Sequence, residues 1–362
     1  MHRIARSRRW LWPATLTCAV ALLFAGCSDS TSPEDFDAAT ASEAAGDVLA
    51  SFDNNPALQA MDFLGDAFPT FGGAASAAPA ARPQDMSGWP ARIDNLRFLE
   101  RIGPFLSPAD PAAVFPIDFL GGTFIYNVDT HRYEFAPDST GGPADGIRLI
   151  LYAVDPVLHQ PVTPLNDIGY LDLTDESTPS ADAIGVLAVV DQVTYLEYLA
   201  SAVQSASSVT FSADGYLSDG EAQVNFTLTH EWSETTGITI SYDVTVPTQS
   251  IALGLDLNLD GLTEAITLGM SVQYGNETAV LSATITETTV DGAVTYNDDP
   301  VVDISGTPQQ PVFTDANGTE LASRDLQALA TLFGSVGLIL DGFDNLLVPA
   351  YLVFTISVFS GW

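Results

Sequence analysis

The chain has 362 residues, and its 11 basic residues, all Arg, face 46 Asp and Glu, which gives a formal net charge of −35 at pH 7. A polyanion of this strength repels nucleic acid and anionic headgroups, so the composition excludes a nucleic-acid partner. The absence of Lys also excludes Schiff-base chemistry.

The chain begins with a basic and then an apolar segment. Four Arg lie among the first nine residues, and an apolar stretch over residues 10–26 follows them. This stretch is short for a bilayer-spanning helix, which needs about 20 apolar residues. The order predicts a cleaved secretion signal over residues 1–26.

The end of this segment carries a recognisable motif. Residues 22–27 end in the small pair Ala25-Gly26 followed by Cys27. This segment resembles the lipobox of bacterial lipoproteins, although Phe24 stands where that family usually has Leu. The resemblance implies cleavage before Cys27, lipid on its sulfur, and anchoring of the exported protein in a membrane. The alternative is an ordinary signal peptide cleaved near Ala25, which would leave Cys27 as a free thiol.

Processing at this site determines the charge and redox state of the mature chain. Ser28 stands where the inner-membrane retention signal of the lipoprotein family has Asp, so the resemblance implies the outer membrane. The mature chain keeps seven Arg against 46 acids, a net charge of −39, and it loses Cys18, the second cysteine. An internal disulfide is then excluded, and stability must come from the core.

The segments before the strands are helical or irregular. After a polar tether over residues 27–34, we expect a helical segment over 35–68, broken near Asn55. A low-complexity linker over 69–90 should allow this segment to move relative to the rest, and a helical or irregular lead-in over 91–120 follows. The second part of the helical segment has apolar residues on one side: Leu58, Met61, Phe63 and Leu64.

Residues 121–314 show an apolar-polar alternation of period two, which is typical of an antiparallel sheet with one buried and one solvated face. The alternation predicts about ten to twelve strands, enough that the sheet must curl or close. It is clearest in the segments 224–232, 238–246, 251–259 and 266–274.

The last segment, 315–362, is predicted to hold a C-terminal helix and an apolar tail. Apolar residues recur at helical spacing between residues 323 and 340, and such a helix must bury its stripe. The expected fold class is therefore mainly β (α+β). It combines a large curled antiparallel meander sheet or half-barrel, a covering C-terminal amphipathic helix and a short helical N-terminal region.

The apolar face of the predicted sheet is the first candidate site. A curled sheet can hold a lipid or other apolar ligand in its concave face if the helical cover leaves room. The candidate ligand-binding residues are Phe226, Leu228, His230, Trp232, Tyr242 and Met270. The alternative is a filled core, in which case the protein is a structural or surface-adhesion module.

The second candidate site is a calcium loop. Asp256, Asn258 and Asp260 alternate before Gly261, as in the first half of such a loop, and Glu264 would be the next ligand. A bidentate Glu at the twelfth position is missing. The alternation also fits an exposed strand face ending in an Asp-Gly turn, so a calcium loop is one of two interpretations of this segment.

Nothing in the sequence indicates catalysis. No nucleophile elbow, phosphate loop or dinucleotide fingerprint is present. Acidic pairs such as Asp175-Glu176 and Asp298-Asp299 resemble glycosidase carboxylates, but such pairs arise by chance in so acidic a chain. We therefore expect an exported lipoprotein without enzymatic activity.

A further alternative places the protein in the outer membrane as an integral β-barrel. Phe354, Ile356 and Val358 alternate with smaller residues before the terminal Trp362, as in the last strand of such a barrel. The helical segments predicted on both sides of the sheet are difficult to place in this architecture.

Overall fold

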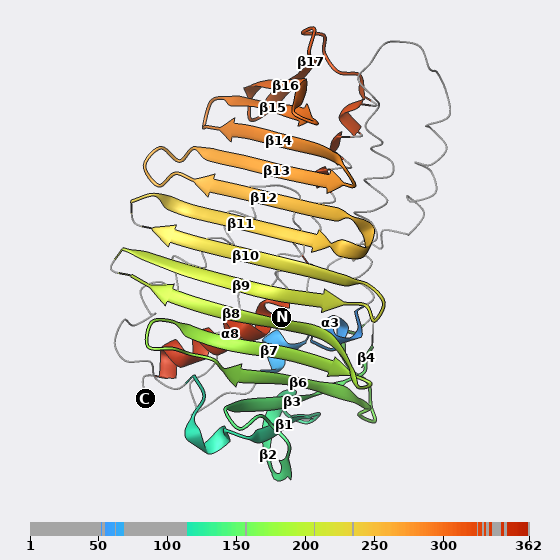
Figure 1. Ribbon diagram of the computed structural model, residues 1–362. Coiled ribbons are helices and arrows are strands. Elements are labelled where there is room, and N and C mark those ends of the chain that lie inside the picture. Colours follow the sequence, from blue (N-terminus) through green and yellow to red (C-terminus); the bar gives the residue numbers. More distant parts are fainter. Residues whose placement is uncertain are drawn as a thin grey trace, which may run out of the picture.

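The fold is mainly β and is built around one large sheet (Figure 1). The computed structural model describes residue 52 and residues 55–61, 63–68, 114–155, 158–205, 207–233, 235–323, 325–327, 329–330, 333–334, 342–343 and 346–360. The predicted fold class is confirmed for these residues, since an open antiparallel sheet dominates them and helices are few.

The sheet has 15 strands, more than the sequence predicted, in the order β17-β16-β15-β14-β13-β12-β11-β10-β9-β8-β7-β6-β3-β1-β2. Their bounds are β1 Gly122–Asn127, β2 Arg132–Thr140, β3 Gly146–Tyr152, β6 Asp167–Asp175, β7 Asp182–Val190, β8 Val193–Gln204, β9 Ser208–Ser218, β10 Gln223–Ser233, β11 Gly237–Val246, β12 Ile251–Leu259, β13 Ile266–Tyr274, β14 Glu277–Ile285, β15 Val290–Tyr296, β16 Asp299–Thr307 and β17 Gln310–Asp315. A separate hairpin pairs β4 (Val154–Asp155) with β5 (Gln160–Pro161).

From β6 to β17 the sheet is a meander in which each strand pairs antiparallel with the next. The start differs from a pure meander, because β1 lies between β2 and β3 and pairs in parallel with β3. Both edge strands contain a proline, Pro137 in β2 and Pro311 in β17. Since proline cannot donate a ladder hydrogen bond, both edges are poor templates for pairing with another chain.

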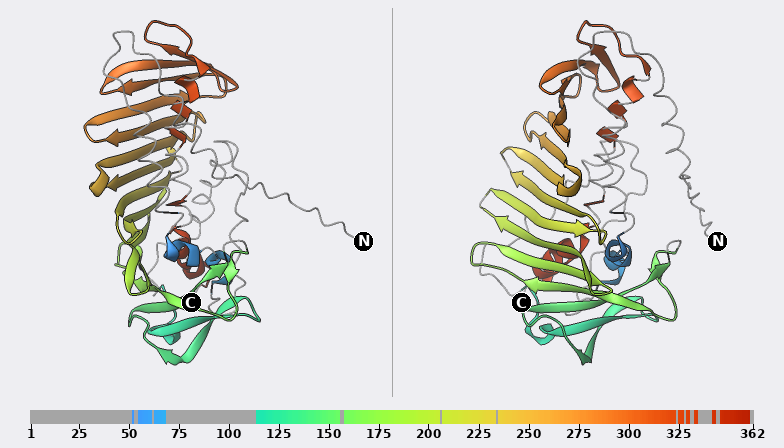
Figure 2. Two further views of the ribbon diagram at one scale, coloured as in Figure 1. Left: turned by 90° about the vertical axis from the view of Figure 1, so that its right-hand side faces the viewer. Right: turned by 45° about the vertical axis from the view of Figure 1, so that its right-hand side comes forward.

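The three α-helices whose bounds are described lie on one face of the sheet, which we call the inner face; the opposite face is the outer face (Figure 2). These helices are α3 (Pro56–Met61), α4 (Leu64–Ala67) and α8 (Val348–Ser360). Two short 3₁₀ helices, η2 (Ile117–Phe119) and η3 (Pro247–Gln249), lie at strand ends. Strands β1 to β6 turn beneath the helices, so the sheet forms an open half-barrel-like trough.

The N-terminal helices α3 and α4 contribute buried residues to the core. The linker predicted over residues 69–90 lies outside the described residues, so the expected mobility of the helical start stays a prediction. Helix α3 contacts β3, β7 and β8, and α4 contacts β2 and α8. The Phe63 ring stacks on Tyr133 at 5.9 Å and meets Tyr126 edge-on at 5.3 Å. The apolar side predicted for this segment packs against the core, with Met61, Phe63 and Leu64 buried and Leu58 partly buried.

The described part of the C-terminal region is helical, as the sequence predicted. The described residues between 323 and 334 are helical, as expected, and Phe333 is buried there, but Leu332, Val336 and Leu340 lie outside the described residues. The alternative in which residues 354–358 form a last strand is wrong, because this segment belongs to helix α8. The sequence of α8 has apolar residues on all sides of the helix instead of along one stripe, which is typical of a buried helix.

Within the described ranges, none of the helices combines the length and the apolar character that a membrane-spanning helix needs.

Candidate functional site

The six predicted ligand-binding residues all lie on the inner face of the sheet. Phe226, Leu228, His230 and Trp232 alternate along β10, and Tyr242 on β11 is the register partner of Leu228. Five of the six are buried; Trp232 is only partly buried, and Met270 lies farther along the sheet on β13. The sequence therefore placed these side chains on the correct face.

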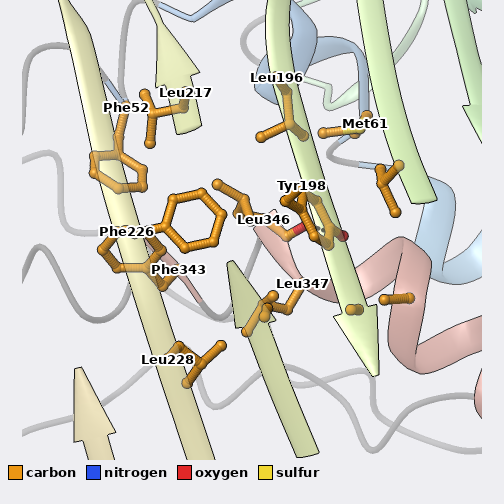
Figure 3. Close-up of a cluster of buried hydrophobic side chains, with 14 of the residues drawn as sticks. Phe52, Met61, Leu196, Tyr198, Leu217, Phe226, Leu228, Phe343, Leu346 and Leu347 are labelled. Atoms are coloured by element: carbon orange, nitrogen blue, oxygen red, sulfur yellow. Dashed lines mark hydrogen bonds between the residues drawn. The ribbon is translucent and has the colours of Figure 1, made fainter. Parts of the chain in front are cut away.

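The C-terminal segment of the chain occupies the space over these residues (Figure 3). The ring of Phe343, which is fully buried, lies 4.9 Å from Phe226 and 6.1 Å from Tyr242. On β9, Phe211 contacts Tyr351 at 4.7 Å and Phe354 at 6.0 Å, both from α8. Protein side chains thus occupy the inner face at Phe211, Phe226 and Tyr242.

A buried tyrosine ties the strands to this covering segment. The Tyr198 hydroxyl on β8 donates a hydrogen bond to the carbonyl of Leu346 at 3.0 Å, and burial raises the pKa of Tyr198 strongly. A buried hydroxyl that finds its partner in the cover loses that partner if the cover leaves, which costs free energy. The cover is held by polar as well as apolar contacts.

His230 is a core residue hydrogen-bonded inside the sheet. Its Nε2 lies 2.9 Å from the Tyr242 hydroxyl, and its ring faces Phe211 at 6.2 Å. Burial lowers the pKa of His230 to about 4, so the imidazole is neutral at physiological pH. A neutral, enclosed imidazole is suited to packing and not to acid-base catalysis at neutral pH.

Asn55 is a structural residue that the sequence revealed only as a helix break. Its Oδ1 accepts the N–H groups of Ala57 and Leu58 at 2.9 and 3.1 Å, so it caps α3. Its Nδ2 donates to the carbonyl of Ser218 at 2.9 Å, and this bond attaches the helix to the end of β9. An Asn directly before a proline at the first helical position is a recognisable helix cap, so the sequence contains a signal that predicts this role of Asn55.

The four predicted calcium ligands are not brought together. Asp256 and Asn258 lie on the outer face of β12, where Asp256 Oδ1 accepts from Ser241 Oγ at 2.8 Å and Asn258 donates to Thr239 at 3.0 Å. Asp260 caps a turn, and the N–H groups of residues 263 and 262 lower its pKa.

Glu264 follows in the same turn with a left-handed backbone. No three Asp, Glu, His or Cys side chains among the described residues are grouped as metal ligands. These residues therefore fit the second interpretation of the sequence, an exposed strand face that ends in a turn.

The acidic pairs considered for glycoside hydrolysis lie at strand ends, because Asp175 ends β6 and Asp299 begins β16. Asp175 Oδ2 accepts the N–H of Val114 at 3.0 Å and its Oδ1 accepts that of Ser177, so this carboxylate holds the chain before β1. Asp298 and Asp299 lie at the turn between β15 and β16. Neither arrangement offers a pair of carboxylates across a cleft.

The outer face of β9 to β12 is polar and acidic. Between Arg148 and Arg324 the sequence contains 25 Asp and Glu and no Lys or Arg. On β9 to β12 the outer side chains are mostly Ser, Thr, Asn and acids, and they hydrogen-bond across strands, as Thr227 Oγ1 does to Asp214 Oδ2 at 2.9 Å. The outer face therefore presents negative charge to solvent.

Two shallow hollows lie on the outer face. The first, of about 380 Å³, spans β9 to β11; the second, of about 430 Å³, spans β6 to β8. The first is lined by Asp214, Gly215, Tyr216, Asn225, Phe226, Thr227, Asp243 and Thr245. The second is lined by Ile168, Gly169, Tyr170, Leu187, Val189, Asp191, Gln192 and Thr194.

An arginine of the chain itself, Arg148, lies next to the second hollow, because Tyr170 both contacts it and lines that hollow. Arg148 on β3 makes two hydrogen bonds to Asp172, Nε to Oδ1 at 2.6 Å and Nη2 to Oδ2 at 2.7 Å. Its guanidinium carbon lies 3.7 Å from the centre of the Tyr170 ring. A carboxylate and an aromatic ring on one strand thus hold a guanidinium on the outer face.

The comparisons with known proteins give no assignment. The chain matches no protein-family model, no curated protein and no solved structure at a significant level. Cys27, the predicted lipidation site, lies outside the described residues. The function must therefore be argued from the sequence motif and from the two faces of the sheet.

Proposed function

We propose that the protein is an exported, non-catalytic lipoprotein anchored in the outer membrane through lipid on Cys27, and that its sheet serves as a structural or surface-adhesion module. The inner face of the sheet stabilises the fold, and the outer face meets the surroundings. The sequence allowed such a filled core as the alternative to a concave face that holds an apolar ligand.

One observation carries this proposal: the chain's own C-terminal segment covers the predicted ligand face. Phe343 contacts Phe226 and Tyr242, and α8 supplies Tyr351 and Phe354 against Phe211. Aromatic pairs at these distances stabilise the packed state beyond their burial alone. A carrier would need these contacts to open before an apolar ligand could enter.

The test of the filled core is native mass spectrometry of the mature chain purified from native membranes with mild detergent. The full mature chain is required, because α3 and α4 are part of the core. We expect only the covalent acyl groups and no additional lipid. A reproducible extra mass of lipid size, lost on mutation of the inner face, would replace this proposal with the carrier hypothesis.

The anchoring part has its own test. The exported wild-type chain should fractionate with membranes and carry an acyl mass on the peptide that begins at Cys27. A Cys27→Ala variant should leave the membrane fraction, and Cys18→Ala, inside the signal, is the matched control. Retention of the Cys27→Ala variant in the membrane fraction would contradict the lipid anchor.

A further inference from the structure

The first hollow on the outer face repeats the residues that hold Arg148, without the arginine. At the Arg148 site, Tyr170 and Asp172 lie two residues apart on one strand, so both point to the outer face. In the hollow, Asp214 and Tyr216 have the same spacing on β9, in reverse order. Each strand therefore presents one carboxylate and one phenol ring side by side.

The neighbouring strand decides whether a guanidinium is present. Arg148 is the register partner of Asp172, whereas the register partner of Asp214 is Thr227. Thr227 is short, and the space above it is the hollow of about 380 Å³. The place that the arginine side chain takes at one site is open at the other.

A second carboxylate faces the same space. Asp243 on β11 is the register partner of Thr227 on its other side, so Asp214 and Asp243 flank Thr227. Strands β9 and β11 lie about 10 Å apart, which leaves room for a guanidinium between the two carboxylates. Beside the hollow, Tyr216 donates its hydroxyl hydrogen bond to Glu197 at 3.0 Å, which holds the phenol ring in place.

The charge of the surrounding surface favours a cationic partner. The sheet from residue 149 to residue 323 carries no Lys or Arg to compete for these acids. Further acids, such as Asp256 on β12, lie on the same face beyond the hollow. A single small cation could neutralise only the carboxylates of the hollow, whereas a segment with several cationic side chains could also neutralise the other acids of the outer face.

We propose that this hollow binds an arginine side chain of a basic segment in a partner protein, with the guanidinium between Asp214 and Asp243 and against the Tyr216 ring. Arginine suits the site better than lysine, because its planar guanidinium bonds carboxylates and stacks on aromatic rings. The inference rests on the proposed function, since it assigns a partner to the outer face of the adhesion module.

The test is fluorescence anisotropy with the full mature chain in detergent and a short labelled peptide of alternating Thr and Arg. The Arg peptide should bind at low salt, weaken when the ionic strength is raised, and bind more tightly than a Thr-Lys peptide of the same length. Absence of binding, or equal binding of the Lys peptide, would overturn the proposal.

Two variants locate the site. Thr227→Arg places a guanidinium in the hollow from the chain itself and should lower the affinity for the Arg peptide about tenfold or more, as should Asp214→Asn with Asp243→Asn. The matched controls are Thr284→Arg, and Asp291→Asn with Asp303→Asn, which make the same charge changes elsewhere on the outer face. Equal losses in variants and controls would show general attraction to a polyanion and overturn the site.

Lipid content, measured on the same preparation, separates this inference from the proposed function. An empty core with no site-specific peptide binding would remove only the inference. Bound lipid would contradict the proposed function, a module with a filled core, and would also contradict the inference that the outer face is the binding surface.

Discussion

The inner and outer faces of β9 to β11 are made by alternate residues of the same strands, yet different forces act on them. On the inner face, Phe226 and Tyr242 are buried, and the ring of Phe343 from the C-terminal segment contacts both. On the outer face, Thr227 and Asp243 are exposed, and polar side chains bond across the strands. Packing therefore governs the inner face, and charge and hydrogen bonding govern the outer face.

This difference separates stability from recognition within one sheet. A buried aromatic contributes transfer and packing free energy that water cannot replace, so its loss destabilises the fold. An exposed carboxylate contributes little to stability, because water and salt screen it, but it sets the charge that a partner meets. Substitutions on the two faces should therefore have effects of different size and kind.

The largest effect is expected for Phe343→Ala on the inner side. Phe343 is fully buried between Phe52, at 5.0 Å, and Phe226, at 4.9 Å, so its truncation leaves a cavity. The free energy of unfolding in urea should fall by about 3–5 kcal/mol. Leu199→Ala on the outer face, where Leu199 is 48% exposed, is the matched control and should cost less than about 1 kcal/mol. Equal losses would contradict the distinction between the faces.

The second effect is a pH dependence that originates on the inner face. The pKa of His230 is about 4 in the folded protein and about 6.5 in the unfolded chain, so only the unfolded state takes up this proton between these values. Stability is therefore fully present above pH 6.5 and is lost as the pH falls toward 4, by about 3 kcal/mol for this group.

The measurement is the free energy of unfolding of wild type and His230→Gln across this pH range. Acidic residues titrate in both proteins, so the difference between the two curves isolates the histidine. That difference should shrink as the pH falls from 6.5 to 4. A difference independent of pH would show that His230 is protonated or exposed in the folded state.

Asn55→Ala should have an intermediate effect, because this residue joins a helix to the sheet. The substitution removes the cap of α3 and leaves the Ser218 carbonyl without this donor. We expect a loss of about 1–3 kcal/mol in thermal or urea unfolding, compared with the more conservative Asn55→Asp, which keeps the cap alone. A neutral result for both variants would mean that the N-terminal helices are not bound to the sheet.

The smallest effect on stability is expected for Asp214→Asn combined with Asp243→Asn. Both residues are exposed on the outer face, and an amide oxygen can still accept the bond from Thr227. The free energy of unfolding should change by less than about 0.5 kcal/mol, although affinity for the Arg peptide falls. A large loss of stability would mean that these acids serve the fold and would remove the basis of the comparison.

The strand alternation allowed much of the sheet to be predicted. The expected strand segments at 224–232, 238–246, 251–259 and 266–274 agree with β10 to β13, because a strand with one buried face must alternate its residues. The strand count was too low, since β14 to β17 and β6 to β9 carry Gly, Ala and exposed apolar residues that blur the pattern. The parallel pairing of β1 with β3 left no trace in the local pattern.

The site was predicted only in part. The inner-face residues were identified correctly as one apolar surface, because periodicity assigns residues to a face. Periodicity does not specify what covers that face, so Phe343 and Tyr351 were not connected with Phe226 and Phe211. The hollow at Asp214 was not predicted, since its carboxylates come from strands 29 residues apart and only the register places them on either side of Thr227.

The sequence by itself determined the alternation of the strands and the extreme acidity, and it alone carries the prediction of a signal segment with a lipobox-like end, because each of these is read from the residues of the chain without tertiary contacts. Only the tertiary structure decided that α8 and Phe343 pack against the concave face, that Asn55 joins the N-terminal helix to β9, and that the candidate calcium residues form no group of metal ligands within the described part of the chain. These outcomes depend on contacts between residues far apart in the sequence. Their free energies arise only when the chain is folded.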